Sequence, residues 1–340
     1  MIKYLGSKRT LLPAILERVA SLQDIQSVLD LFSGTARVGH ALKGAGYQVH
    51  SNDLNAYAST LARCYVVADA ERHGAQAEAL IVELNRLKGK AGPFTQTYCV
   101  DSRYFQVKNG ARIEAMRHQI AAWDLEPVLE SVLLTSLMEA ADRVDSTTGV
   151  QMAYLKSWAP RSHRDIELRL PNLLPRAQHG PGHAYQGDAL EIAHEVTADL
   201  AYLDPPYNQH KYLGNYHVWE TLVRWDAPEV YGVARKRVDV RDRKSPYNSK
   251  PKALGAFKEL VDTVRAPNLL ISFSDEGYIS REEMEDLLSQ RGSLETYVFD
   301  FKRYVGAQIG IHNPAGKKVG KVSHTRNREF LYVLRRDERL

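Results

Sequence analysis

The stretch from Leu200 to Tyr207 constrains the fold of this chain more than any other. Its first four residues, Leu-Ala-Tyr-Leu, carry no charge and do not alternate, which is typical of a parallel strand buried on both faces. Pro205 and Pro206 cannot donate hydrogen bonds to a neighbouring strand, so this strand must stop at Asp204. Because open α/β sheets bind ligands at the carboxyl ends of their strands, the sequence predicts a site there with a carboxylate and the Tyr207 ring.

A strand, a glycine turn and a helix are predicted upstream. Residues 28–32 form a buried-strand candidate, Gly34 follows in a short polar turn, and apolar residues then recur at helical spacing. This arrangement is typical of nucleotide-binding α/β units, although it lacks the three spaced glycines of the dinucleotide fingerprint. The turn fits S-adenosylmethionine better, because the methionine end of that cofactor must lie close against the backbone.

Two more acidic residues follow predicted strands. Asp53 lies about 20 residues after the glycine turn, where a carboxylate can accept both hydroxyls of a ribose. The alternative is that Asp53 is a solvated carboxylate at the end of a strand and binds no ligand. Asp188 lies 16 positions before Asp204. It could receive the adenine amine of a cofactor, cap the next helix, or do both. Near the N-terminus, Gly6 precedes a predicted helix, where backbone amides can face an anion, but a plain helix start explains it equally well.

The pattern of strands is interrupted between the strand that ends near Asp53 and the strand that ends near Asp188. Periodic apolar residues predict helices over 77–87, 111–123 and 127–144. A crossover between two strands needs only about 30 residues, so much of this stretch is surplus. We therefore predict a mostly helical subdomain over 65–183, inserted between the parts 1–64 and 184–340 of one α/β domain.

The C-terminal part returns to alternating helices and strands. Helices are predicted over 258–264 and 282–289, and buried strands over 268–274, 296–299 and 330–334. The last two strands have no helix between them, which predicts an antiparallel pair.

Basic residues are clustered, although the net charge is only +4. We predict two basic loops: segment 235–252 has eight Lys or Arg and two Asp, and segment 302–328 has seven Lys or Arg and no acid. Such clusters suit a phosphate backbone, with a solvated loop as the alternative. The candidates for DNA contact are Arg161, Arg164, Lys211, Arg241, Arg243, Lys244, Lys317 and Lys321.

Other classes of protein are disfavoured. The two cysteines make no metal-ligand pattern and no disulfide framework, which predicts reduced thiols and no metal site. We expect no signal peptide and no membrane span, and hence a cytoplasmic protein.

The chain resembles the Dam-type family of DNA adenine methyltransferases in their alpha arrangement. Asp204-Pro-Pro-Tyr207 is similar to the signature of amino-group methyltransferases. Residues 3–8, Lys-Tyr-Leu-Gly-Ser-Lys, resemble the family's opening motif. Asp30-Leu-Phe-Ser-Gly34 resembles its cofactor motif, although a second glycine arrives only at Gly39. The likeness runs nearly from end to end.

The resemblance implies a Rossmann-like, seven-stranded class I methyltransferase sheet whose helical insertion recognises the target sequence. It implies S-adenosylmethionine as cofactor, double-stranded DNA as partner and a flipped target adenine. It leaves open a cognate restriction endonuclease, and it implies a monomer or weak dimer in the bacterial cytoplasm, associated with the nucleoid. The cofactor residues that it implies are Tyr4, Gly6, Lys8, Asp30, Phe32, Gly34, Asp53 and Asp188.

Catalysis is assigned to the four residues of the signature. Asp204 would accept one proton of the adenine amine in a hydrogen bond, and the carbonyl of Pro205 would accept the other, which localises the nitrogen lone pair. Pro206 fixes the turn, and Tyr207 would stack on the flipped base. The competing hypotheses are an RNA adenine N6-methyltransferase, a protein glutamine methyltransferase, which usually has Asn in place of Asp204, and a catalytically inactive DNA-binding module.

Overall fold

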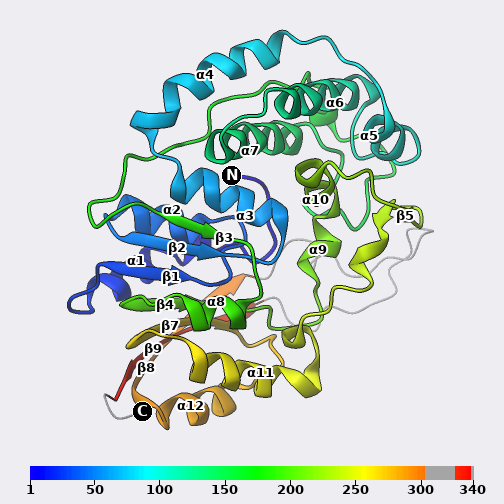
Figure 1. Cartoon of the computed structure of the whole chain (residues 1–340). Coiled ribbons are helices and arrows are strands. Elements are labelled where there is room, and N and C mark those ends of the chain that lie inside the picture. The colour runs from blue at the N-terminus through cyan, green and yellow to red at the C-terminus, as the bar shows by residue number, and fades with distance from the viewer. Residues whose placement is uncertain (303–325, 338–340) are drawn as a thin grey trace.

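The computed structural model describes residues 1–302 and 326–337, and its centre is a seven-stranded sheet (Figure 1). The order across the sheet is β3-β2-β1-β4-β7-β9-β8. The five strands from β3 to β7 are parallel, and β9 is antiparallel to both of its neighbours. The strands are β1 (Ser27–Asp30), β2 (Gln48–Asn52), β3 (His183–Tyr185), β4 (Leu200–Leu203), β7 (Asn268–Ser274), β8 (Gly292–Lys302) and β9 (Arg326–Arg336).

The central strands lack alternation because helices cover both of their faces. Side chains of β4 alternate between two cores, with Leu200 and Tyr202 in one and Ala201 and Leu203 in the other. One face is covered by α1 (Leu12–Ala20), α2 (Arg37–Gly44) and α3 (Ala56–Ala62), and the other by α8 (Ala189–Glu195), α11 (Lys250–Thr263) and α12 (Arg281–Ser289). A strand buried on both sides needs apolar residues at successive positions, as the sequence predicted.

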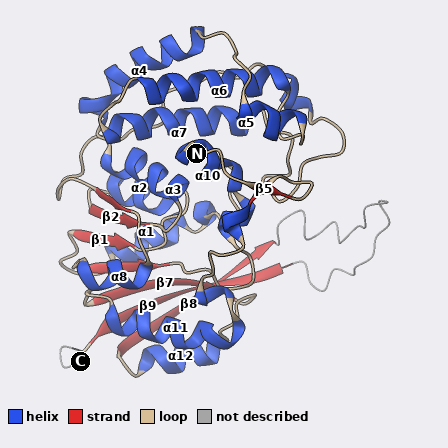
Figure 2. Ribbon diagram, turned by 45° about the vertical axis from the view of Figure 1, so that its right-hand side comes forward, coloured by secondary structure: helices blue, strands red, loops and turns tan. Residues whose placement is uncertain are grey.

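The inserted helices stack on the α3 side of the sheet. They are α4 (Ala70–Arg86), α5 (Pro93–Thr95), α6 (Val107–Ala122) and α7 (Pro127–Arg143), and π-helical turns follow α3 at Arg63–Val67 and α5 at Gln96–Val100. Figure 2 shows α4, α6 and α7 beyond α2 and α3, away from the sheet. Buried residues of α3 and α7 belong to one continuous core. The predicted subdomain is therefore packed onto the α/β part rather than held apart from it.

Most predicted elements are present, with shifted ends. β4 and β7 have the expected bounds, and the closing pair β8–β9 is antiparallel as predicted but longer. Helix α3 was not predicted, because its small residues carry no clear apolar periodicity. α4 begins seven residues earlier than the predicted start at 77, and α11 eight residues earlier than 258. Pro251 in the first turn of α11 is compatible with a helix, so it did not mark a boundary.

The basic segment 235–252 was predicted as a loop, but it contains regular structure. It follows α9 (Tyr212–Asn215) and α10 (His217–Arg224) and contains β6 (Lys236–Arg237), which pairs with β5 (Val230–Tyr231) in a separate two-stranded sheet. Short 3-10 turns follow at Val238–Val240 and Pro246–Asn248, and α11 begins within the segment. We call residues 238–248 the strap. Most of the other basic segment, 303–325, lies outside the described residues.

Candidate active site

The candidate site lies where the sheet changes its winding direction. β1 and β4 are parallel neighbours, with Asp30 opposite Tyr202, and the strands that follow each of them lie toward opposite edges of the sheet. The crevice at their carboxyl ends is therefore the expected place for a ligand. A cleft opens there, and it is lined by the N-terminal segment, the β1–α2 turn, the ends of β2 and β3, the segment after β4 and the strap.

The cleft gathers residues that are far apart in the chain. It is lined by all eight residues that the sequence suggested for cofactor binding: Tyr4, Gly6, Lys8, Asp30, Phe32, Gly34, Asp53 and Asp188. Asp204 and Pro206 line it as well, whereas Pro205 and Tyr207 stand outside the lining that the described residues form. The predicted residues thus come together, and their individual roles stay predictions.

The turn after β1 requires glycine. Gly34 has a φ of +52°, in the left-handed region that residues with a side chain rarely adopt. A Cβ at this position would also meet the ring of Tyr4 at 3.2 Å. The Gly34 N–H donates to Asp53 Oδ2 at 3.0 Å, which joins this turn to the end of β2. The backbone of the turn can therefore approach a ligand closely.

Aromatic rings hold the segments around the cleft together. Tyr4 stacks on Tyr212 and Tyr216, with ring centroids 5.3 and 4.6 Å away. Phe32, after β1, meets Tyr247 of the strap edge to face at 5.5 Å. Such pairs add stability beyond the area that they bury. They fix the N-terminal segment against α9 and the strap against the β1–α2 turn.

Asp30 is a buried carboxylate at the end of β1. Only 1% of its surface is exposed, and neither oxygen makes a hydrogen bond of ordinary geometry with the described residues. Burial raises the pKa of Asp30 to about 8, the charge of Asp204 adds to the increase, and the Gly39 amide opposes it. A buried carboxylate without a partner is unfavourable, so this end of the cleft suits a cationic group of a ligand.

Asp53 and Asp188 both make hydrogen bonds within the fold. Asp53 Oδ1 accepts from the backbone and side-chain amides of Asn55, at 2.9 and 3.1 Å. Burial raises the pKa of Asp53 to about 6, although its hydrogen bonds oppose the increase. Asp188 Oδ1 accepts from the Leu190 N–H at 2.9 Å and caps α8. An ionised carboxylate has about four acceptor positions, so both residues can still accept from a ligand.

Lys8 contacts the catalytic candidate directly. Its Nζ lies 3.1 Å from Asp204 Oδ1 and 3.3 Å from Glu329 Oε2, and 7% of the lysine side chain is exposed. Burial raises the pKa of Asp204 to about 6; the charge of Lys8 lowers it and that of Glu329 raises it. Burial acts to lower the pKa of Lys8, but the two carboxylates raise it well above its ordinary value. Lys8 is therefore a buried cation between two acids.

Tyr207 lies beside this group and packs against the end of β7. Its ring centroid is 5.8 Å from that of Phe273 and 6.0 Å from the Lys8 ammonium. The Tyr207 carbonyl accepts from the Tyr278 N–H at 2.8 Å, which fixes the turn after the two prolines. Tyr207 as a whole is half-buried.

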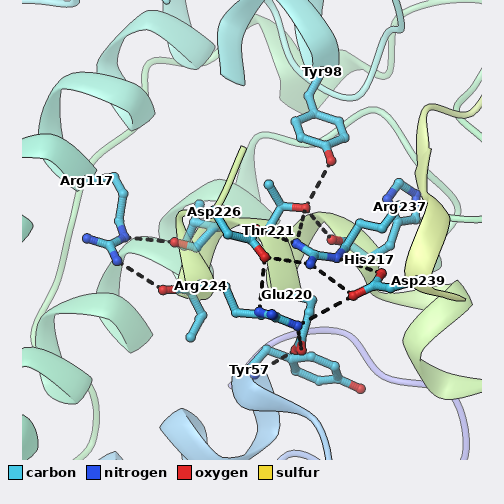
Figure 3. A network of polar contacts seen from close by, with 12 residues as sticks. Tyr57, Tyr98, Arg117, His217, Glu220, Thr221, Arg224, Asp226, Arg237 and Asp239 are labelled. Atoms are coloured by element: carbon cyan, nitrogen blue, oxygen red, sulfur yellow. Dashed lines mark hydrogen bonds and ion pairs between the residues drawn. The ribbon is translucent and has the colours of Figure 1, made fainter. Parts of the chain in front are cut away.

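The strap is anchored at both ends. Near its C-terminal end, Asn248 donates to the carbonyls of Asn208 and His210 at 2.6 and 3.2 Å, in the segment that follows Tyr207. Near its N-terminal end, Asp239 lies 3.0 Å from Arg237, which also pairs with Asp226 at 2.7 Å (Figure 3). These contacts tie the strap to both the catalytic turn and the β5–β6 hairpin.

Glu220 of α10 joins the strap to the cofactor side of the cleft. The side chain is fully buried, and its Oε2 accepts from the backbone N–H of Tyr57, in the first turn of α3, at 3.1 Å (Figure 3). Its Oε1 lies 3.2 Å from Arg243 of the strap. Burial raises the pKa of Glu220, and Tyr57 and Arg243 oppose the increase. One carboxylate thus connects α3, α10 and the strap.

The predicted DNA contacts fall into different environments. Arg161 pairs with the buried Asp145 at 2.7 Å, and Arg243 pairs with Glu220, so both have structural partners. Lys317 and Lys321 lie outside the described residues. The other four are the exposed Arg164, Arg241 and Lys244 and the half-buried Lys211, which lines the cleft with Lys244.

Sequence reasoning missed several residues of the site. Tyr212 follows the signature in a stretch rich in aromatic residues, which was a usable signal. Tyr247 and Asn248 lie in a segment that was assigned to DNA contact, so their place in the cleft was not expected. Glu329 precedes a predicted strand, and no local pattern distinguishes it, because β9 brings it to the site only through the sheet order.

The sheet order, the cleft between β1 and β4 and the Asp-Pro-Pro-Tyr turn define a class I methyltransferase of the kind that acts on amino groups. Residues 4–285 match the family of D12 class N6 adenine-specific DNA methyltransferases, and the chain belongs to this family.

Three relatives of the chain are modification methylases or type II methyltransferases by name. It is 30% identical to modification methylase StsI of Streptococcus sanguinis, over 91% of this chain and 50% of the relative. It is 30% identical to type II methyltransferase M.FokI of Planomicrobium okeanokoites, over 87% of this chain and 48% of the relative. It is 28% identical to type II methyltransferase M.NlaIII of Neisseria lactamica, over 97% of this chain and 100% of the relative. The chain thus spans about half the length of the first two relatives and all of the third.

Two negative findings hold for residues 1–302 and 326–337. No helix there is both long enough and apolar enough to cross a membrane. No three or more His, Cys, Asp or Glu side chains gather there in a way that could hold a metal ion.

Proposed function

We propose that this chain transfers a methyl group from S-adenosylmethionine to the exocyclic N6 amine of adenine in double-stranded DNA, at a specific sequence. The observation that carries the proposal is Asp204, held at the end of β4 by Lys8 and facing the same cleft as the Gly34 turn. Membership of the D12 family supports adenine in DNA as the substrate. The type II relatives support a role as the modification enzyme of a restriction-modification system, with a cognate endonuclease as partner.

The residues of the cleft fit S-adenosylmethionine. Among the described residues, neither Asp30 oxygen has a cationic partner, so Asp30 suits a cationic group of the methionine end, and the Gly34 turn, which lines the same cleft, would contact that end with its backbone. Asp53 would accept from the ribose hydroxyls and Asp188 from the adenine amine. Bound there, the cofactor would supply an electrophilic methyl group on its sulfonium.

The residues of the signature would prepare the target amine. This amine is a weak nucleophile, because its lone pair is delocalised into the ring. Asp204, ionised above a pH of about 6, would accept one amine proton in a hydrogen bond, and the Pro205 carbonyl would accept the other. Together they localise the lone pair and stabilise the charge that develops on nitrogen. The ring of the half-buried Tyr207 would stack on the flipped base.

The inserted helices and the basic segments would bind the DNA. We infer that 65–183 recognises the target sequence, because it adds a layer of structure that the sheet does not require. Exposed Arg164, Arg241 and Lys244 are available for phosphates. We infer a monomer or weak dimer that acts with DNA in the bacterial cytoplasm.

A methyl-transfer assay with labelled S-adenosylmethionine tests this function. Duplex DNA and ribosomal RNA are offered separately and in competition, and the product is digested to nucleosides. We expect N6-methyladenine from the duplex and none with Asp204→Ala, which should still bind the cofactor in calorimetry. Label in RNA alone would favour the RNA enzyme. Absence of both label and cofactor binding would favour an inactive DNA-binding module.

A further inference from the structure

Glu329 shares Lys8 with the catalytic candidate Asp204. It lies beyond residues 4–285, which match the family, and outside every motif found in the sequence. Side-chain exposure is 17% for Glu329, 19% for Asp204 and 7% for Lys8, so the three charges form a largely buried group at the cleft.

The antiparallel strand explains why Glu329 reaches the site. In β9 it stands opposite Ser274, at the carboxyl end of β7, because β9 runs in the reverse direction. The start of β9 therefore lies at the edge of the sheet where the parallel strands end. Leu331 and Val333 face the core beneath α1 and α2, and Glu329, two positions earlier, faces the same side. Lys8 enters on that side, just before α1.

One ammonium between two carboxylates has a chemical consequence. A lysine paired with Asp204 alone would direct its charge fully at the carboxylate that must accept a proton from the amine. Glu329 accepts a second N–H of the same ammonium at 3.3 Å and divides that charge. We propose that Glu329 is a positioning residue that acts through Lys8 and keeps Asp204 basic enough to polarise the target amine. This role rests on the function proposed above.

Other titratable groups also face Asp204 and must be considered with Glu329. They come from the N-terminal 3-10 turn, β1, β4, the segment after β4 and β9, and they are Lys8, Asp30, Tyr202, Tyr207, Tyr212 and Glu329. Burial raises the pKa of each of the three tyrosines, so they are neutral in the pH range of interest. Burial also raises the pKa of Asp30, to about 8. Glu329 and Lys8 are therefore the charges that set the ionisation of Asp204 near neutral pH.

The test is the pH profile of kcat for methyl transfer to duplex DNA. Glu329→Gln removes the charge that raises the pKa of Asp204, so the acid limb should move to lower pH by about one unit. The plateau kcat should fall, because a less basic Asp204 is a weaker acceptor. Lys8→Gln removes the charge that lowers the pKa of Asp204, so the acid limb should move to higher pH. In the Lys8→Gln background, Glu329→Gln should shift the limb less than it does alone.

Controls separate this role from a purely structural one. Glu295→Gln, on the neighbouring β8 and paired with the exposed Arg335, should leave the profile unchanged. The double variant of Lys8→Gln and Glu329→Gln replaces the charged pair with two neutral side chains of similar shape. It can be measured if Glu329→Gln alone does not fold.

The outcomes separate the proposed function from the role of Glu329. A wild-type protein that transfers no methyl to adenine rejects the proposed function and this role with it. An active wild type whose Glu329→Gln variant keeps its acid limb rejects the role of Glu329 alone. If Glu329→Gln shifts the acid limb equally in the wild type and in the Lys8→Gln variant, Glu329 does not act through Lys8.

Discussion

At the scale of single residues, the site depends on carboxylates that the fold buries. Asp204 is 19% exposed in its side chain and would be protonated more readily without Lys8. Asp30 has no such partner among the residues that the structure describes. The two residues should therefore respond differently to substitution, since Asp204 is paired with a lysine and Asp30 is not.

Asp204→Asn should reduce kcat by about 100-fold or more, because an amide is a much weaker acceptor for the amine proton. Cofactor affinity should change little, since the substitution preserves shape. Single-turnover methylation and calorimetry with S-adenosylmethionine measure the two effects. Near-normal turnover would show that Asp204 is not the acceptor.

The ionisation of Asp204 predicts the pH dependence of the wild type. Burial raises its pKa from an ordinary 3.8 to about 6, and only the ionised form can accept the amine proton. The kcat should therefore fall as the pH decreases through about 6, by about tenfold per pH unit below it. A pH profile of single-turnover rates checks this, and an acid limb near pH 4 would contradict the raised pKa.

Asp30→Asn should stabilise the protein without ligand and weaken cofactor binding. The folded-state pKa of about 8 exceeds the ordinary 3.8, so wild-type stability is full at acid pH and is lost as the pH rises toward 8. Asparagine does not ionise, so the gain should grow by about 1.4 kcal/mol per pH unit between pH 5 and 8, which is roughly 4 kcal/mol over that range. Urea unfolding at the two pH values measures it. Cofactor affinity should fall by about tenfold, as expected for a lost hydrogen bond to a charged group.

At the scale of elements, the strap closes one side of the cleft and depends on buried ion pairs. Arg243→Ala leaves the fully buried Glu220 without its strap partner, so the strap should loosen. We expect weaker cofactor binding with a smaller change in kcat. Arg241→Ala is the matched control, because Arg241 is exposed and stacks on Tyr231 at 3.8 Å. Equal effects of the two substitutions on cofactor affinity would contradict the anchoring role.

Arg241 and Lys244 should instead affect DNA binding. Removing both charges should weaken binding to any sequence and reduce the slope of log affinity against log salt by about two. Titrations with duplex DNA at several salt concentrations measure the slope. An unchanged slope would move the DNA path away from the strap.

At the scale of the whole molecule, the inserted helices and the sheet share one core. Leu137 of α7 is fully buried in the core that also contains α3. Leu137→Ala should destabilise the protein by about 2–5 kcal/mol. Both parts should unfold in one transition, which circular dichroism and tryptophan fluorescence can follow together. Leu254→Ala on α11 is the control, since Leu254 is 38% exposed. Two separate transitions would indicate an independent subdomain.

Local sequence determined the elements that build the sheet and the motifs at its edge. β4 and β7 have no alternation because both of their faces are covered, and prolines end β4, so their bounds follow from the residues themselves. The Gly34 turn and Asp204 were identifiable for the same reason: each is a local conformational or chemical requirement. The antiparallel closing pair was predicted because the sequence showed no helical pattern between its strands.

Tertiary structure decided which of these residues meet. Lys8 was expected to hold the methionine end of the cofactor, but the fold also pairs it with Asp204 and Glu329, which are 196 and 321 positions away. Arg243 was expected to contact DNA, but its neighbour in space is a buried glutamate of α10. Sequence spacing does not encode such contacts. They arise because parallel strands end at one edge while an antiparallel strand begins there, and because burial then sets the charge of each group.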